Sequence, residues 1–190
     1  GEDVAVLVEQ AQREVEQITE LIDEVLFLSE LESGGRVVAL GPTPIRPVLE
    51  EALAELQERA DRGGIVLELE CHPQIEIAIR PRMLRVVARN LAENAIRYAG
   101  PGATFTLAVE ESDDGSVALI GSDDGIGVED PELPRLFERF YRSDRARASR
   151  GTGLGLAIVK HIVTQAGGTV EARGARGHGL EIRCTFPLSA

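Results

Sequence analysis

A run of alternating glycines that leads directly into an apolar segment is the sequence feature that most constrains the fold of this chain. The run spans residues 151–155, and the helix-forming segment 154–166 ends at Gly167-Gly168. Glycines at a helix start let the backbone approach a ligand closely, and the free N–H groups there attract anions, usually phosphate. Many glycine-rich loops only turn the chain, so the run alone leaves both interpretations open.

The two best-known phosphate-binding loops do not fit this run. A P-loop would end in Gly-Lys-Ser/Thr, and a dinucleotide-binding loop would follow a buried strand. Here the glycines follow an arginine-rich stretch and no Gly-Lys-Ser/Thr is present. The ligand must therefore be inferred from the rest of the sequence.

Charge and composition exclude several classes of protein. A net charge of −12 argues against a nucleic-acid partner. No apolar run approaches the roughly 18 residues of a membrane span, and no signal peptide opens the chain, which predicts a cytoplasmic location without direct membrane contact. Cys71 and Cys184 lack C-x-x-C spacing and are expected to be small buried side chains in a reducing compartment.

Residues 2–32 are predicted to form one long helix. Apolar residues recur at three- and four-residue steps, at Val4, Leu7, Val8, Ala11, Val15, Ile18, Leu21, Ile22, Val25, Leu28 and Leu31. Ten acidic residues and one arginine occupy positions between them. At helical rise the segment is ~46 Å long. It could lie on its own domain, but its length and unbroken pattern favour a bundle helix with partner helices elsewhere, and its uncapped start favours a preceding portion of the protein.

The remaining pattern indicates an α+β layer. Further helices are expected over 48–62 and 81–98, and strands over 37–40, 65–70 and 75–79. Two hairpins are expected, one joining 104–109 to 117–122 and one joining 169–173 to 180–186. Hairpins and segregated helices predict helices packed on one face of a mixed, largely antiparallel sheet.

The helix expected over 81–98 carries a polar face opposite its apolar stripe. Asn90, Glu93, Asn94 and Arg97 lie at i, i+3, i+4 and i+7 on that face. Two Asn one turn apart could be a solvated surface. A carboxamide oxygen is also a good ligand for Mg²⁺, which takes oxygen donors and keeps phosphates and waters as its other ligands.

Two later segments add ligand-binding chemistry. Asp123 ends a predicted strand before Gly125 and Gly127; it can accept a hydrogen bond from an exocyclic amine, although the segment could also be a simple Asp-Gly turn. A short amphipathic helix is expected over 133–140. The stretch 135–150 holds six arginines, which predicts a lid over a polyanion; they are Arg135, Arg139, Arg142, Arg145, Arg147 and Arg150.

Four motifs in this order resemble the asparagine, first glycine, phenylalanine and second glycine boxes of sensor histidine protein kinases. They are Asn90-Leu-Ala-Glu-Asn94-Ala-Ile-Arg97-Tyr98, Asp123-x-Gly125-x-Gly127, Leu136-Phe-Glu-Arg-Phe140-Tyr141-Arg142 and Gly151-Thr152-Gly153-Leu154-Gly155-Leu. The resemblance implies a Bergerat-type ATP-binding α/β sandwich over 36–190. Residues 1–34 resemble part of a dimerisation and phosphotransfer hairpin, its second helix.

The resemblance also implies roles for individual residues. Asn94 would bind Mg²⁺ on the phosphates of ATP or ADP, and Asp123, in the loop with Gly125 and Gly127, would bind the adenine amine. Asn90, Glu93 and Asn94 form the implied catalytic set. The remaining implied nucleotide contacts are Arg97 and Arg142 to phosphate, Tyr98 and Tyr141 beside the nucleotide, and Gly151, Thr152, Gly153, Leu154 and Gly155 around the phosphates.

Asn90 bears on the type of reaction. In the gyrase, chaperone and mismatch-repair ATPases of the same superfamily, the matching position is a Glu that activates water. An amide cannot accept that proton. The resemblance therefore favours transfer of the γ-phosphate to another side chain over hydrolysis.

The chain departs from the family pattern in three places. The phosphoacceptor motif His-Glu-x-Arg/Lys-Thr/Ser-Pro is absent, and His72, His161 and His178 each lack its context. Gly121 stands where the family usually has an apolar strand residue, which predicts a locally weaker strand. Ala166 replaces a frequent His before the final glycine pair.

The sequence thus predicts the ATP-binding catalytic domain of a two-component sensor histidine kinase, which transfers the γ-phosphate of Mg-ATP to a histidine outside this chain. The expected partners are the histidine-bearing hairpin of the same kinase, which forms a homodimer in the full protein, and the receiver domain of a response regulator. The full protein is expected to be anchored in the bacterial inner membrane. Two alternatives stay open: a serine kinase of the anti-sigma type, and a nucleotide-dependent interaction module that transfers nothing.

Overall fold

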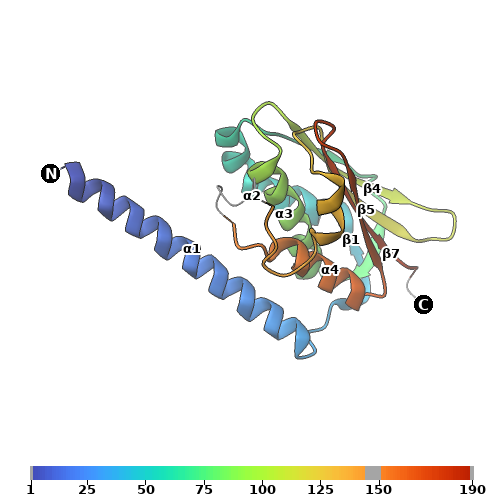
Figure 1. Ribbon diagram of the computed structural model, residues 1–190. Helices are drawn as coiled ribbons and strands as arrows, with labels where there is room; N and C mark the ends of the chain where they lie inside the picture. Colours follow the sequence, from blue (N-terminus) through green and yellow to red (C-terminus); the bar gives the residue numbers. More distant parts are fainter. Residues whose placement is uncertain (1, 144–150, 189–190) are drawn as a thin grey trace.

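A five-stranded sheet forms the centre of the computed structural model, which describes residues 2–143 and 151–188 (Figure 1). The strand order is β2-β4-β5-β7-β6; β2 and β4 run parallel, and the other neighbouring pairs run antiparallel. The strands are β2 (Val66–Glu70), β4 (Thr104–Glu111), β5 (Val117–Asp123), β7 (Leu180–Phe186) and β6 (Thr169–Gly174). A separate two-stranded sheet pairs β1 (Val38–Pro44) with β3 (Glu76–Ile79).

Three helices cover one face of the five-stranded sheet (Figure 1). They are α2 (Ile45–Gly63), α3 (Pro81–Tyr98) and α4 (Gly155–Gln165). Leu84, Val87 and Leu91 of α3 are buried in the same core as the inward-facing residues of β7, such as Ile182. Because the apolar stripes of the helices meet the apolar face of the sheet, the fold is the predicted α/β sandwich. Both predicted hairpins are confirmed as β4–β5 and β6–β7.

The amphipathic helix predicted over 133–140 is wrong. The chain instead forms a 3-10 helix, η1 (Asp130–Arg135), followed by turns. Pro134 lies inside the segment, and a proline lacks the N–H group and the free space that an α-helix interior requires. A capping box between Glu129 and Glu132 also starts η1 earlier than predicted. The apolar spacing was therefore outweighed by the proline and the cap.

Two strand predictions differ from the structure in extent and partner. The strand predicted over 37–40 continues as β1 to Pro44, and Thr43 Oγ1 donates a buried hydrogen bond of 2.7 Å to the carbonyl of Ile79. The strands predicted over 65–70 and 75–79 exist, but they belong to different sheets. Alternating burial predicts a strand and does not say with which strand it pairs.

The long helix is confirmed as α1 (Glu2–Glu32), and its two ends differ in environment. Leu28 and Leu31 are buried in the core of the domain. Val4, Leu7 and Ile18 are each more than half exposed, and α1 extends well beyond the domain (Figure 1). The helix thus lies on its own domain at one end and presents the rest of its apolar stripe to solvent. The division of the chain into 1–34 and 36–190 stays a prediction.

Gly121 makes room for a neighbouring aromatic ring. A methyl group on Gly121 would lie 3.1 Å from the Phe105 ring and 3.2 Å from Cβ of Leu91. Phe105 itself is buried. The ring therefore fills the space that an apolar side chain at 121 would take, and packing at this point of β5 is complete.

The cysteines are buried, as predicted. Cys71 and Cys184 are both free thiols in the core, and burial raises the pKa of Cys184 to about 12. Burial also raises the pKa of Cys71, so both thiols are disfavoured as thiolates at neutral pH. Across the described residues, no helix combines the length and the apolar character needed to cross a bilayer.

Candidate functional site

A cavity of about 400 Å³ opens between α3, the loop after β5, η1 and the loop before α4. Its wall carries apolar side chains along the loop after β5, the carboxylates of Glu129 and Glu132 at η1, and amide, cationic and acidic side chains along α3. The lining residues are Glu24, Asn90, Glu93, Asn94, Arg97, Tyr98, Ile126, Gly127, Val128, Glu129, Glu132, Leu136, Tyr141, Arg142, Ser143, Thr152, Gly153, Gly155, Leu156, Arg176 and Leu180. Its size and its few convergent polar groups are those of a small-molecule site.

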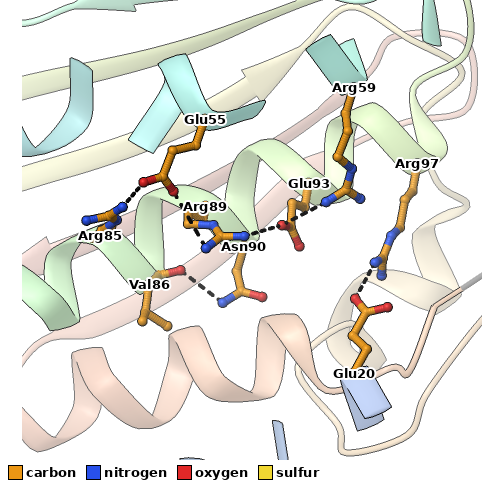
Figure 2. Close-up of polar contacts among 9 residues, drawn as sticks. All are labelled: Glu20, Glu55, Arg59, Arg85, Val86, Arg89, Asn90, Glu93 and Arg97. Carbon is orange, nitrogen blue, oxygen red and sulfur yellow. Dashed lines mark hydrogen bonds and ion pairs between the residues drawn. The ribbon is translucent and has the colours of Figure 1, made fainter. Parts of the chain in front are cut away.

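The start of α4 is fitted to the polar face of α3. The Asn90 amide donates a hydrogen bond of 2.9 Å to the Val86 carbonyl (Figure 2). A methyl group on Gly155 would lie 2.7 Å from Asn90 Oδ1. Gly155 therefore lets the carboxamide of Asn90 lie against the glycine loop, and Asn94 lines the cavity one turn further along α3.

Glu93 lies within a chain of ion pairs that joins α2 to α3. Its carboxylate is 3.1 Å from Arg59 and 3.2 Å from Arg89, and Arg89 also lies 3.6 Å from Glu55 (Figure 2). The Glu93 side chain is only 14% exposed. Because two guanidinium groups balance its charge, Glu93 anchors α3 on α2; its predicted catalytic role stays a prediction.

The glycine loop packs against the end of α3. A methyl group on Gly151 would lie 2.8 Å from the Tyr98 hydroxyl and 3.3 Å from Nη1 of Arg97. The Thr152 hydroxyl accepts the N–H of Leu154 at 3.2 Å, and the Leu154 side chain is fully buried. Gly151 and Leu154 thus fix the loop by packing on the domain, whereas Arg97, Tyr98 and Thr152 line the cavity.

Acidic side chains of α1 meet two of these residues. Arg97 donates to the Glu20 carboxylate at 2.5 Å (Figure 2), and the Thr152 hydroxyl donates to the Glu24 carboxylate. Burial raises the pKa of Glu24, against the opposing effect of the Thr152 hydrogen bond. The polar end of the cavity therefore has a wall that comes from α1.

Asp123 ends β5 just before the loop whose Ile126 and Val128 line the cavity, and it is not itself a lining residue. Its carboxylate accepts the N–H of Gly125 at 2.9 Å, and burial raises its pKa against the effect of backbone N–H groups. A methyl group on Gly125 would lie 2.2 Å from the Ala99 carbonyl oxygen, and one on Gly127 2.0 Å from that of Ala175. These glycines serve close backbone packing, and Gly127 also lines the cavity.

The described part of the predicted lid is fastened to the glycine loop. Phe140 has a φ of 60° and its N–H donates to the Gly153 carbonyl at 2.9 Å. The guanidinium of Arg135 stacks 4.3 Å from the centre of the Tyr141 ring. Tyr141 and Arg142 line the cavity. The predicted lid residues Arg145, Arg147 and Arg150 lie outside the described residues.

The structure brings most of the predicted residues to one cavity. The residues that line it are Asn90, Glu93, Asn94, Arg97, Tyr98, Gly127, Tyr141, Arg142, Thr152, Gly153 and Gly155, whereas Asp123, Gly125, Gly151 and Leu154 do not line it. Sequence reasoning missed the acidic and apolar walls. The spacing of Glu129 and Glu132 is a capping-box signal, and Ile126 and Val128 flank motif glycines. Glu24 and Arg176 come from distant segments, with no local signal.

Comparison with known proteins agrees with this geometry. Residues 79–190 match the family described as histidine kinase-, DNA gyrase B-, and HSP90-like ATPase. The signal transduction histidine-protein kinase BaeS of Escherichia coli (strain K12) is 34% identical over 180 residues, which cover 93% of this chain and 38% of BaeS. The mycobacterial sensor histidine kinase MprB has a TM-score of 0.70 at 29% identity, covering 77% of this chain and 97% of that one. Full-length ShkA in complex with AMPPNP has a TM-score of 0.76 at 28% identity, covering 95% of this chain and 38% of that one.

The matched region contains every box residue and almost the whole wall of the cavity. It begins before α3 and ends after β7, so Glu24 is the one lining residue that lies outside it in the described part of the chain. The chain spans less than half the length of BaeS. The chain belongs to the family of histidine kinase-, DNA gyrase B- and HSP90-like ATPases and is similar to the catalytic part of sensor histidine kinases.

Proposed function

We propose that the cavity binds ATP or ADP with Mg²⁺ and that the whole protein transfers the γ-phosphate to a histidine outside this chain. The observation that carries this is one cavity that joins the loop after Asp123, where Ile126 and Val128 line it, to the polar group of Asn94, Arg97 and Arg142. Adenine fits the first and a triphosphate the second. Phosphoryl transfer requires mainly positioning and charge neutralisation, which these residues can supply.

The donor set fits Mg²⁺. Asn94 contributes a neutral oxygen at the cavity, and Mg²⁺ in nucleotide sites takes one or two protein oxygens with phosphates and waters as its remaining ligands. The ion would neutralise charge on the phosphate oxygens. Within the described residues no group of three His, Cys, Asp or Glu side chains could hold a metal ion without the nucleotide. Metal binding is therefore expected to depend on ATP.

Asn90 favours transfer over hydrolysis. Its amide nitrogen already donates to Val86, and its oxygen lies beside Gly155. Neither atom can take a proton from a water molecule. A general base for hydrolysis is therefore missing at this position of the site.

The acceptor is expected to come from the histidine-bearing hairpin of the same kinase, with a receiver domain as the next acceptor. None of His72, His161 and His178 lines the cavity; His161 on α4 instead contacts Gln165 at 2.9 Å. BaeS and MprB are described as histidine kinases, which supports this choice over a serine kinase. The cytoplasmic placement and the membrane anchor stay predictions.

Asp123→Asn is expected to weaken ATP binding about tenfold or more and to reduce the preference for ATP over GTP, because a charge-assisted hydrogen bond to the adenine amine is lost. Guanine presents a carbonyl oxygen at the position of that amine. Titration calorimetry with both nucleotides measures the change. Equal affinities of the original chain for ATP and GTP would contradict the assignment.

The same variant is expected to be at least as stable as the original chain. The pKa of Asp123 is raised in the folded state, so its ionisation opposes folding, and this contribution lowers stability as the pH rises through the raised pKa. Asn removes that charge and keeps an oxygen for the Gly125 N–H. Denaturant unfolding therefore separates a binding defect from a folding defect.

Transfer is tested by adding the isolated upstream hairpin of the same gene, which should carry the acceptor histidine. With γ-labelled ATP and Mg²⁺, the hairpin should become labelled and the label should be acid-labile, as expected of phosphohistidine. ATP binding without labelling of the hairpin would instead support an interaction module. Labelling of His72, His161 or His178 in the absence of the hairpin would overturn the assignment of the acceptor.

A further inference from the structure

Among the described residues, α1 contacts the domain through the acidic side chains of Glu20, Glu24, Glu30 and Glu32, and one of these, Glu24, lines the cavity. Glu30 pairs with Arg82 at 3.3 Å and Glu32 pairs with Arg139. Glu20 and Glu24, one turn apart on α1, instead meet Arg97 and Thr152, which both line the cavity. Glu30 and Glu32 hold the end of α1 on the domain, whereas Glu24 lines the cavity and Glu20 pairs with one of its lining residues.

The carboxylates of Glu20 and Glu24 bind two donors, Arg97 and Thr152, to which the proposed function assigns phosphate. A carboxylate and a phosphate oxygen are recognised by the same donors, a guanidinium and a hydroxyl at a glycine loop. The Glu20 carboxylate accepts a hydrogen bond of 2.5 Å from the Arg97 guanidinium. The Glu24 carboxylate accepts one from the Thr152 hydroxyl and forms part of the cavity wall. Thus α1 occupies two donors that a triphosphate would need.

Packing holds this part of α1 only loosely. A groove of about 660 Å³ separates α1 from α3 on the side of Asp23, Phe27, Val86 and Arg89. Among the described residues of α1, Leu28 and Leu31 near its end are the fully buried apolar side chains, and Leu21 and Phe27 pack on the core while only partly buried. The segment with Glu20 and Glu24 is therefore held by its polar contacts and by one partly buried apolar side chain, Leu21, so its release exposes little apolar surface.

We propose that Glu20 and Glu24 are an internal competitor for the phosphates of ATP, so that nucleotide binding and docking of α1 on the cavity exclude each other. This rests on the proposed function of the cavity. When α1 is docked, two carboxylates occupy the donors and repel the triphosphate. When ATP is bound, Arg97 and Thr152 face phosphate and α1 is released around its buried end at Leu28 and Leu31.

The competition is tested by Glu20→Gln combined with Glu24→Gln in the 190-residue chain, with Mg²⁺ present. An amide removes the charge and keeps the size of each side chain. The variant is expected to bind ATP about tenfold more tightly, within the usual range of coupling between two sites. The gain should be smaller for ADP and absent for adenosine, which has no phosphate to compete.

Glu14→Gln combined with Glu16→Gln is the matched control. Both residues lie on exposed positions of α1, so the change in net charge is the same while the cavity contacts remain. This control should bind ATP as the original chain does. An equal gain in the control would mean a general electrostatic effect and would overturn the proposal, as would an equal gain for adenosine.

Reciprocity gives a second measurement. Spin labels on Gln17→Cys in α1 and Gln57→Cys in α2 occupy exposed positions, whereas Cys71 and Cys184 are buried. Saturating ATP should change the distance distribution between the labels, and adenosine should leave it unchanged. An unchanged distribution with bound ATP, or equal ATP affinity of the Gln variant and the original chain, refutes the competition and leaves the proposed function intact. Absence of ATP binding in every variant refutes both.

Discussion

Asn94→Ala is expected to reduce transfer of the γ-phosphate to the acceptor hairpin at least about a hundredfold, because a metal that neutralises phosphate charge contributes several kcal/mol to such reactions. Asn94 supplies the protein oxygen proposed for Mg²⁺ at the cavity. Alanine offers no oxygen, so Mg-ATP would lose both its anchor and its orientation. Phosphotransfer to the hairpin with γ-labelled ATP, measured over a range of Mg²⁺ concentrations, gives the size of the loss.

The fold of this variant should be retained. α3 packs through Leu91 and Ala95, which are buried, whereas Asn94 is half-buried at the cavity. His161→Ala is the control, since His161 contacts Gln165 on α4 and does not line the cavity; transfer should be largely unchanged. Full transfer by Asn94→Ala at low Mg²⁺ would show that another group holds the metal.

The elements of this fold that local sequence determines were predictable. α3 begins at Pro81 and ends before Gly100, as its N-terminal proline and following glycine predict. The glycine run likewise predicted the start of α4, and the structure adds the reason for Gly155, which accommodates Asn90. In these segments the chain's own dihedral preferences and apolar spacing decide the structure.

Contacts between distant segments were not predictable from the same patterns. β2 and β3 are adjacent in sequence and alternate in burial, yet they join different sheets. Nothing in the acidic pattern of α1 distinguishes Glu20 and Glu24 from its exposed acidic residues. Glu20 and Glu24 face Arg97 and Thr152 because of the direction in which α1 leaves the domain. Tertiary packing alone decides that direction.

Gly125→Ala is expected to destabilise the domain by about 3 kcal/mol or more, at the upper end of what overpacking usually costs. The added methyl group would lie 2.2 Å from the Ala99 carbonyl oxygen and 2.6 Å from its Cα and Cβ. Ala99 is buried at the end of α3, and its carbonyl accepts the N–H of Ile126 at 2.9 Å. The backbone has no room to yield without breaking that bond. Thermal and denaturant unfolding should both show the loss.

The contact at Gly125 joins the loop proposed to hold adenine to α3, which carries Asn94 and Arg97. A shift of the loop would move Ile126 and Gly127 away from Arg97 and Tyr98, so nucleotide affinity should fall together with stability. Gly41→Ala is the control: Gly41 is exposed on β1, a methyl group there would meet nothing within 4 Å, and its effect should stay within about 0.5 kcal/mol. If Gly125→Ala has the same free energy of unfolding as the control, the loop does not pack closely against Ala99. The proposed contact between the two parts of the site would then be wrong.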